Sequence, residues 1–232
     1  MIINDPIFPN FSERLILLKD KCSICNEEYD FIGDNIIWGN GNKYGNIMVI
    51  GKDSAKPKKE PKDELWKGSF YTKMPLTNIT TGKRFRNFLK DTGFNLSDVF
   101  ITNAVKCNSC VESNILKAFK SNKTIFLKLS KNCSDYLKEE IRRIRPKVII
   151  TLGDAKIPVD GLLDKNEKEE ELNIKGVDIN QFINQKLPFR GKFANSVRSE
   201  VYNLKHPSML TGGKEGYIKT LKVIANHIIM GI

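Results

Sequence analysis

Four short runs of β-branched and aromatic residues most constrain how this chain of 232 residues can fold. Each run ends close to Gly, Asn or a His-Pro pair, as buried strands do where a loop begins. Between the runs, the stretches 83–91, 133–145 and 215–230 carry apolar residues at helical spacing. The four runs are Asn46–Ile50, Val99–Asn103, Lys147–Leu152 and Val201–Leu204. This alternation predicts a three-layer α/β/α sandwich with a central four-stranded, mainly parallel sheet.

Length and charge limit the class of protein. A chain in which 40% of the residues are hydrophobic fits a single domain over 1–232, with an N-terminal arm over 1–45. No apolar run is as long as a membrane span, and the first residues lack the layout of a secretion signal, so we expect a cytoplasmic protein. A monomer is the simplest state. The formal net charge of +11 favours a polyanion such as DNA, because each neutralised phosphate releases counterions. A lysine-rich composition without a nucleic-acid partner is the alternative.

Polar residues follow each of the four predicted strands. Asp53 lies just beyond Gly51 at the end of the first strand, Asn103 closes the second, Asp154 follows the third and His206 follows the fourth. The carboxyl ends of parallel strands meet at one edge of a sheet, where open α/β folds bind their ligands. We therefore expect these residues to share one rim.

The cysteines predict a metal centre. Cys22 and Cys25 form a CxxC pair, and Cys107 and Cys133 are single and distant, so four thiolates can hold a soft metal and tie the N-terminal arm to the body. Five cysteines in a chain without an export signal favour metal ligation over disulfides. Sulfur ligands suit an iron-sulfur cluster or zinc. Because Cys107 also forms a CxxC with Cys110, a zinc site with Cys110 as a ligand stays open.

Six motifs occur in an order that is specific as a set. They are the CxxC at 22–25, Ile47–Gly51, Phe100–Cys107, Ile144–Gly153, Arg190–Gly191 and His206–Ser208. Together they resemble the iron-sulfur uracil-DNA glycosylases of the family-four type. The resemblance implies the fold of those enzymes, removal of uracil from DNA in base excision repair, and a 4Fe-4S cluster bound by Cys22, Cys25, Cys107 and Cys133.

The chemistry of such an enzyme can be matched to the predicted rim. Breaking a base-sugar bond develops positive charge on the sugar and negative charge on the departing base. Asp53 can stabilise the sugar cation and orient water, and an N–H of His206 can stabilise charge on the base. By the resemblance, Asn103 reads the base, since its amide satisfies both a donor and an acceptor, and Gly51 lines the same pocket.

Two departures from the family lie in the catalytic loop. The segment 51–55 reads Gly-Lys-Asp-Ser-Ala, whereas the family has a segment like Gly-Glu-Ala-Pro-Gly, so the acid is shifted to Asp53, as in family-one enzymes. The family also stacks a Phe on the flipped base. Here Leu76 occupies the matching place, unless Phe70 or Tyr71 supplies the ring.

Two groups of residues are candidates for DNA binding. Met209 and Leu210, which follow Ser208, resemble a loop that wedges into the duplex as a base flips out. Packing of Leu210 under the last helix is the alternative. Lys52 and Lys56 lie in a lysine-rich loop beside the predicted pocket and can grip phosphates, or they are simply solvated.

We therefore expect a DNA glycosylase for uracil or a related deaminated base. No lysine is placed to form a Schiff base, so we expect a monofunctional enzyme without strand cleavage. Two alternatives stay open. One is a glycosylase for another lesion such as hypoxanthine, and the other is a metal-containing DNA-binding protein that has lost catalysis.

Overall fold

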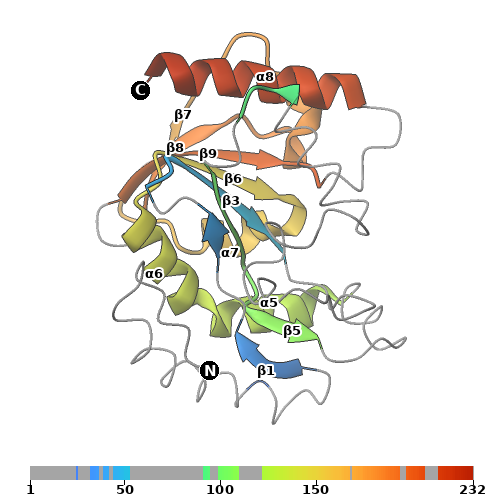
Figure 1. Cartoon of the computed structure of the whole chain (residues 1–232), viewed down its shortest axis with the longest axis vertical. Helices are drawn as coiled ribbons and strands as arrows, with labels where there is room; N and C mark the ends of the chain where they lie inside the picture. Colours follow the sequence, from blue (N-terminus) through green and yellow to red (C-terminus); the bar gives the residue numbers. More distant parts are fainter. Residues whose placement is uncertain are drawn as a thin grey trace.

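A seven-stranded mixed sheet forms the middle of the computed structural model, and helices cover both of its faces (Figure 1). The structure describes residues 25, 32–36, 39–41, 44–52, 91–94, 99–109, 122–167, 169–193, 197–206 and 214–231.

Four neighbouring strands run parallel and form the centre of the sheet. β3 (Ile47–Gly51) lies between β4 (Val99–Asn103) and β6 (Val148–Leu152), and β9 (Val197–Leu204) pairs with β6. All residues of β3, β4 and β6 are buried, as expected for parallel strands covered on both faces. These are the strands that the sequence predicts, so the α/β architecture is confirmed.

Three antiparallel strands that were not predicted extend this centre at its edges. β2 (Asn40–Gly41) pairs with β4, β8 (Phe189–Phe193) pairs with β9, and β7 (Glu170–Glu171) pairs with β8. β2 and β7 are too short to show an alternating pattern. In β8, Gly191 weakens the strand signal, and a Cβ there would lie 2.6 Å from the side chain of Leu163.

The helices complete the two outer layers. α8 covers one face of the sheet, and α6 and α7 lie on the other face, with α5 next to them (Figure 1). The helices predicted at 133–145 and 215–230 are confirmed, whereas the one predicted at 83–91 lies outside the described residues except for Asp91. The helical segments are α5 (Lys123–Asn132), α6 (Ser134–Ile144), α7 (Lys156–Asp160), α8 (Lys214–Gly231) and the 3-10 turns η3 (Gly153–Ala155), η4 (Ile179–Gln181) and η5 (Ile183–Gln185).

α6 has clear start and stop signals. Asp135 lies in its first turn, and Arg142 and Arg143 lie in its last turn. Each of these charges interacts favourably with the helix dipole and stabilises the helix. The helix ends at Ile144, its C-cap residue Arg145 adopts the left-handed conformation with φ 50°, and Pro146 follows. The position of α6 is therefore well determined by local sequence.

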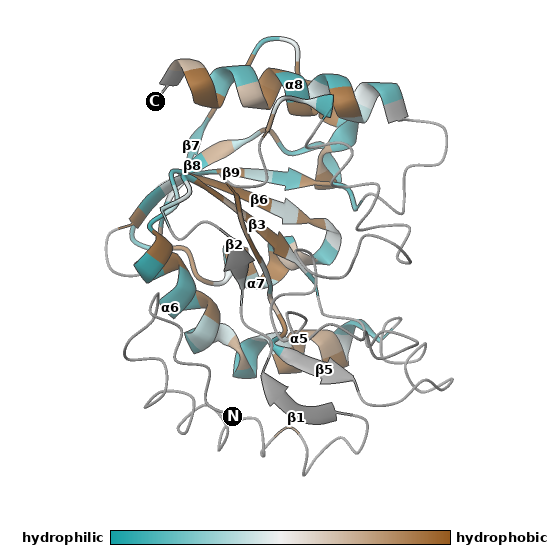
Figure 2. Ribbon diagram, in the orientation of Figure 1, coloured by the Kyte–Doolittle hydropathy of each residue, from teal (hydrophilic) through white to brown (hydrophobic). Residues whose placement is uncertain are grey.

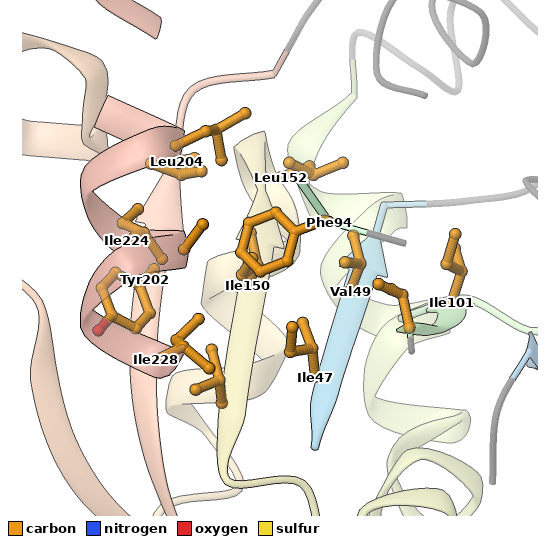
Figure 3. Packing of buried hydrophobic residues seen from close by; sticks show 14 of the residues in the cluster. Ile47, Val49, Phe94, Ile101, Ile150, Leu152, Tyr202, Leu204, Ile224 and Ile228 are labelled. Atoms are coloured by element: carbon orange, nitrogen blue, oxygen red, sulfur yellow. The ribbon is translucent and has the colours of Figure 1, made fainter. Parts of the chain in front are cut away.

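The two faces of the sheet bury separate clusters. Ile47 and Val49 of β3 point to the α8 side, and Met48 and Ile50 point to the α6 and α7 side, as strand alternation requires. On the α8 side, Figure 3 shows strand residues packed against helix residues such as Ile224. The hydrophobic colouring of β3 and β6 in Figure 2 marks the same centre of the fold.

The N-terminal arm contacts the body through a second, small sheet. β1 (Ile32–Ile36) pairs antiparallel with β5 (Cys107–Ser109), and Ile36 lies opposite Cys107. Next to it, Gly39 packs closely on β4, since a Cβ there would lie 2.3 Å from the ring of Phe100. The division into a single domain with an arm over 1–45, the monomeric state and the cytoplasmic location stay predictions.

Candidate active site and cysteine centre

The carboxyl ends of the parallel strands form the rim that the sequence predicts. Gly51 and Asn103 are register partners at the ends of β3 and β4. The pairing continues beyond the strands, because the N–H of Ala104 donates to the carbonyl of Gly51 (2.8 Å) and that of Val105 donates to the carbonyl of Lys52 (3.0 Å). The backbone around Asn103 is thus held firmly against the start of the proposed catalytic loop.

Asn103 is the most informative side chain of the rim. It is 1% exposed, yet within the described part of the chain its Oδ1 atom has no hydrogen-bond partner. A buried polar atom without a hydrogen bond lowers the stability of the folded state by about 1–3 kcal/mol, and native proteins contain few such atoms. The atom is suited to accept a hydrogen bond from a ligand.

His206 lies two residues beyond β9 and is half-buried. Gly153, at the end of β6, has φ +61°, and a Cβ there would lie 3.2 Å from the Cβ of His206. A glycine at this turn therefore allows both the left-handed backbone and the close approach of the imidazole-bearing segment. His206 is fixed on the same rim as Asn103.

The distance between the two rim residues follows from the strand order. Asn103 ends β4 and His206 follows β9, with β3 and β6 between them. Neighbouring strands are about 4.8 Å apart, so the two backbones are separated by about 14 Å. The ends of β3 and β6 form the part of the rim that lies between these two residues.

Lys52 occupies the middle of this rim. Its ammonium Nζ lies 3.0 Å from Oδ2 of Asp154 and 4.7 Å from the centre of the Phe126 ring. The lysine side chain is 19% exposed and the Asp154 side chain is 54% exposed. In this structure the Lys52 charge is directed to Asp154 and Phe126, and its predicted contact with DNA phosphates is untested.

Many predicted site residues lie outside the described residues, so their placement stays a prediction. They are Asp53, Lys56, Phe70, Tyr71, Leu76, Ser208, Met209, Leu210, Cys22 and Cys110. The structure therefore brings together Gly51, Lys52, Asn103 and His206 and leaves the carboxylate of the loop untested.

The cysteine centre is described in part. Cys25 and Cys133 are each 1% exposed. The Sγ of Cys133 accepts a hydrogen bond from the backbone N–H of Lys106 (3.4 Å), and the Sγ of Cys25 accepts one from Nδ2 of Asn132 (3.5 Å). Since Asn132 precedes Cys133 and Lys106 precedes Cys107, three of the four predicted ligand positions come from segments that meet here.

These residues fit a thiolate-bound metal. Buried sulfur atoms that receive N–H donors are typical of iron-sulfur and zinc ligands, whose charge such donors stabilise. Among the described side chains, no group of three or more His, Cys, Asp or Glu residues forms a metal site, and the side chains of Cys22 and Cys107 are not among them.

Comparison with known proteins decides the family. A family model described as the uracil DNA glycosylase superfamily matches residues 38–226, which is more than half of the chain. The chain belongs to the uracil DNA glycosylase superfamily. The match includes all four parallel strands of this glycosylase fold and both rim residues.

A curated superfamily member is also similar. The chain is 28% identical over 140 residues to a protein named type-4 uracil-DNA glycosylase from Archaeoglobus fulgidus. The similarity covers 60% of this chain and 57% of that protein, so the match spans little more than half of each. Both comparisons agree with the resemblance seen in the sequence motifs.

Three polar residues of this glycosylase fold were missed by sequence reasoning: Thr102, Lys106 and Glu140. All three are buried and hydrogen-bonded to one another. The available signal was a glutamate on the apolar stripe of the helix predicted at 133–145, whereas Lys106 lies between two strands, where no pattern predicts burial. In the described helices, no segment is both long and apolar enough to cross a membrane.

Proposed function

We propose that this protein is a monofunctional DNA glycosylase that hydrolyses the N-glycosidic bond of uracil, or of a related deaminated base, in DNA. The observation that carries the proposal is the buried Oδ1 of Asn103, which lacks a described partner at the rim where this superfamily fold binds its ligand.

Base recognition follows from the amide chemistry of Asn103. Its Oδ1 accepts a hydrogen bond from N3–H of uracil, and its Nδ2 donates one to the O4 atom. Cytosine offers the opposite pattern at this edge, with an acceptor at N3 and a donor at N4, so it leaves both amide groups unsatisfied. In the proposed pocket, the backbone of Gly51 lies against the base, with Leu76, Phe70 or Tyr71 providing the stacking surface.

The bond-breaking step uses opposite charges at the two ends of the pocket. The carboxylate of Asp53 faces the sugar, stabilises the cation that develops there and orients the attacking water. An N–H of His206 donates to the departing base and stabilises its negative charge. The position of His206 above Gly153 supports this role, since it places the imidazole-bearing segment across the rim from Asn103.

DNA is the proposed partner. The net charge of +11 supports binding to phosphates, and Lys52 and Lys56 follow β3 in the sequence. Ser208, Met209 and Leu210 follow His206 and would enter the duplex as the base leaves it. We expect affinity to fall steeply with salt.

We further propose a 4Fe-4S cluster held by Cys22, Cys25, Cys107 and Cys133. When bound, the cluster would tie the N-terminal arm to the body through four strong bonds, without taking part in the reaction. The buried sulfur atoms of Cys25 and Cys133 support this ligand set. Zinc, or a set that includes Cys110, is the rival.

Metal analysis and colour distinguish the two centres. A brown protein with iron and sulfide, bleached by Cys133→Ser, is expected for the cluster. A colourless protein with one zinc ion, which Cys110→Ser removes, would refute it.

A second candidate substrate is another deaminated base, such as hypoxanthine. It is favoured by Lys52, which places a cation at the rim where the resembled family has Glu. A lysine ammonium in the active site can interact with the acceptor atoms of a base whose acceptors are arranged differently from those of uracil.

The test is incubation with oligonucleotides that carry one uracil, hypoxanthine, xanthine or thymine, followed by alkali to reveal abasic sites. We expect release of uracil and none of thymine. Asn103→Ala should reduce the preference for uracil over cytosine, and Asp53→Asn should slow release with little effect on DNA affinity. Asn166→Ala, at an exposed position, is the matched control. DNA binding without release of any base would instead support a protein that has lost catalysis.

A further inference from the structure

A lysine is buried completely between the rim and the cysteine centre. Lys106 is 0% exposed, and it lies in the short segment that joins β4 to β5. Charged side chains are almost never fully buried unless they are paired, because removal of an ion from water is costly. Packing alone does not explain why a lysine, and not an apolar residue, occupies this buried position.

The partners of Lys106 form a closed ring. Its ammonium Nζ donates to Oγ1 of Thr102 and to Oε2 of Glu140, and the Thr102 hydroxyl donates to the same carboxylate oxygen (2.8 Å). The other carboxylate oxygen of Glu140 accepts the backbone N–H of Gly39 (2.8 Å). Both oxygens of the buried carboxylate are therefore hydrogen-bonded, as a stable buried ion requires.

The ring joins three parts of the proposed site. Thr102 directly precedes Asn103 in β4, and Lys106 directly precedes Cys107. Glu140 lies two helical turns after Cys133, so both lie on the same side of α6. Lys106 contacts this helix twice, through its backbone N–H to Cys133 Sγ and through its ammonium to Glu140.

We propose that Lys106 is a positioning residue that couples the cysteine centre to the base-reading Asn103. It fixes the register of α6 against β4, so that the segment carrying Asn103 and the segment carrying Cys107 keep one arrangement. The proposal rests on the base-reading role of Asn103 proposed above.

Directional contacts explain why an ion pair serves here better than apolar contact. Contacts between apolar side chains are not directional, whereas charge-assisted hydrogen bonds require a defined donor and acceptor geometry. Replacement of a buried ion pair by apolar residues is often neutral for stability, so the benefit of this pair is expected in the accuracy of the site. A displacement of about 1 Å at a reacting group slows catalysis by about 100-fold.

The test compares variants that leave no unpaired buried charge. In Lys106→Met with Glu140→Gln, both charges are removed and the side-chain volumes are nearly kept. In Thr102→Val the ion pair remains but its link to β4 is lost, and Thr102→Ser restores the hydroxyl. Glu139→Gln is the matched control, because Glu139 is on the same helix and pairs with Arg142 and Arg143 instead.

Three readouts are measured on each metal-loaded protein: the single-turnover rate of uracil release, the metal content, and hydrogen exchange of the amides of Ala104 and Val105. We expect the double variant to fold and to release uracil about 100-fold more slowly, with faster exchange of these two amides and unchanged exchange in β6. Thr102→Val should show a smaller effect in the same direction, and Thr102→Ser should restore the wild-type values.

Normal release and normal exchange in both the double variant and Thr102→Val would overturn the proposal. A double variant that does not fold leaves Thr102→Val and Thr102→Ser to decide, since neither disturbs the ion pair itself. If the wild-type protein releases no uracil, the proposed function fails, and the exchange of Ala104 and Val105 still decides whether Lys106 holds this segment.

Discussion

The two faces of the central sheet are built on different principles. On the α8 face, strand residues such as Ile47, Val49 and Ile150 pack against Leu221 and Ile224 in a continuous apolar cluster. On the α6 face, apolar residues share the interface with a buried ring of Thr102, Lys106 and Glu140. The polar ring lies where the sheet meets the cysteine centre.

This difference shows how stability and accuracy are divided in the molecule. Burial of apolar surface is strongly favourable but not directional, so the α8 face contributes chiefly to the stability of the fold. Buried hydrogen-bonded charges add little net stability, and their hydrogen bonds require a defined geometry. With the role proposed for Lys106, the α6 face is the one that sets the position of the strand ends.

The largest effect on stability is expected when one partner of the buried ion pair on the α6 face is removed. Lys106→Met leaves Glu140 buried without its countercharge, which should lower the free energy of unfolding by about 3–5 kcal/mol. Adding Glu140→Gln should recover most of this loss, since no unpaired charge remains. Urea unfolding of the single and double variants measures both values. A single variant as stable as the wild type would contradict the contrast between the faces.

The apolar face should respond to loss of volume in a different way. Leu221→Ala in α8 should lower the free energy of unfolding by about 2–5 kcal/mol, through lost burial and the cavity that remains. Unlike the stability lost in Lys106→Met, this loss should not be recovered by removing the charge of a second residue. The folded variant should keep the wild-type rate of base release. Lys222→Ala, at the exposed neighbouring position, serves as control. A selective loss of catalysis in folded Leu221→Ala would contradict the assigned role of this face.

A smaller effect is expected at the rim, where the two faces meet. Asp154→Asn removes the partner of the Lys52 ammonium, so stability should change by less than about 1 kcal/mol, as for other partly exposed ion pairs. The variant loses a negative charge that competes with phosphate for the Lys52 ammonium, so the slope of log affinity against log salt should steepen by about 1. Fluorescence anisotropy over a salt series measures this slope. An unchanged slope would indicate that Lys52 does not reach the phosphates.

The smallest effect concerns acid sensitivity at the edge of the α8 face. A side-chain hydrogen bond from Gln181, with a backbone hydrogen bond from Asn180, lowers the pKa of Asp178 below its ordinary value. Its contribution to stability is thus complete above the unfolded pKa of about 3.9 and is lost as the pH falls through the lower folded pKa. Asp178→Asn should weaken the pH dependence of thermal unfolding in this acidic range and leave it unchanged at neutral pH.

Several parts of the molecule were predictable because local patterns carry them. The four parallel strands are continuous runs of buried residues, and α6 has charged ends, an apolar stripe and a proline stop. The position of Asn103 and His206 on one rim then follows from the rule that parallel strands end at the same edge. The short edge strands β2 and β7 were missed, because two residues show no period.

The sequence by itself determined the α/β architecture, the rim that carries Asn103 and His206, and the motifs of the uracil DNA glycosylase superfamily, because these depend on periodicity and on order along the chain. Only the tertiary structure decided that Lys52 turns to Asp154 and that Lys106 pairs with Glu140. These partners are separated by 102 and 34 positions, so no local pattern links them. Both pairs form only when the sheet and its helices bring distant charges together, and in the buried Lys106–Glu140 pair each charge requires the other because the interior has a low dielectric constant.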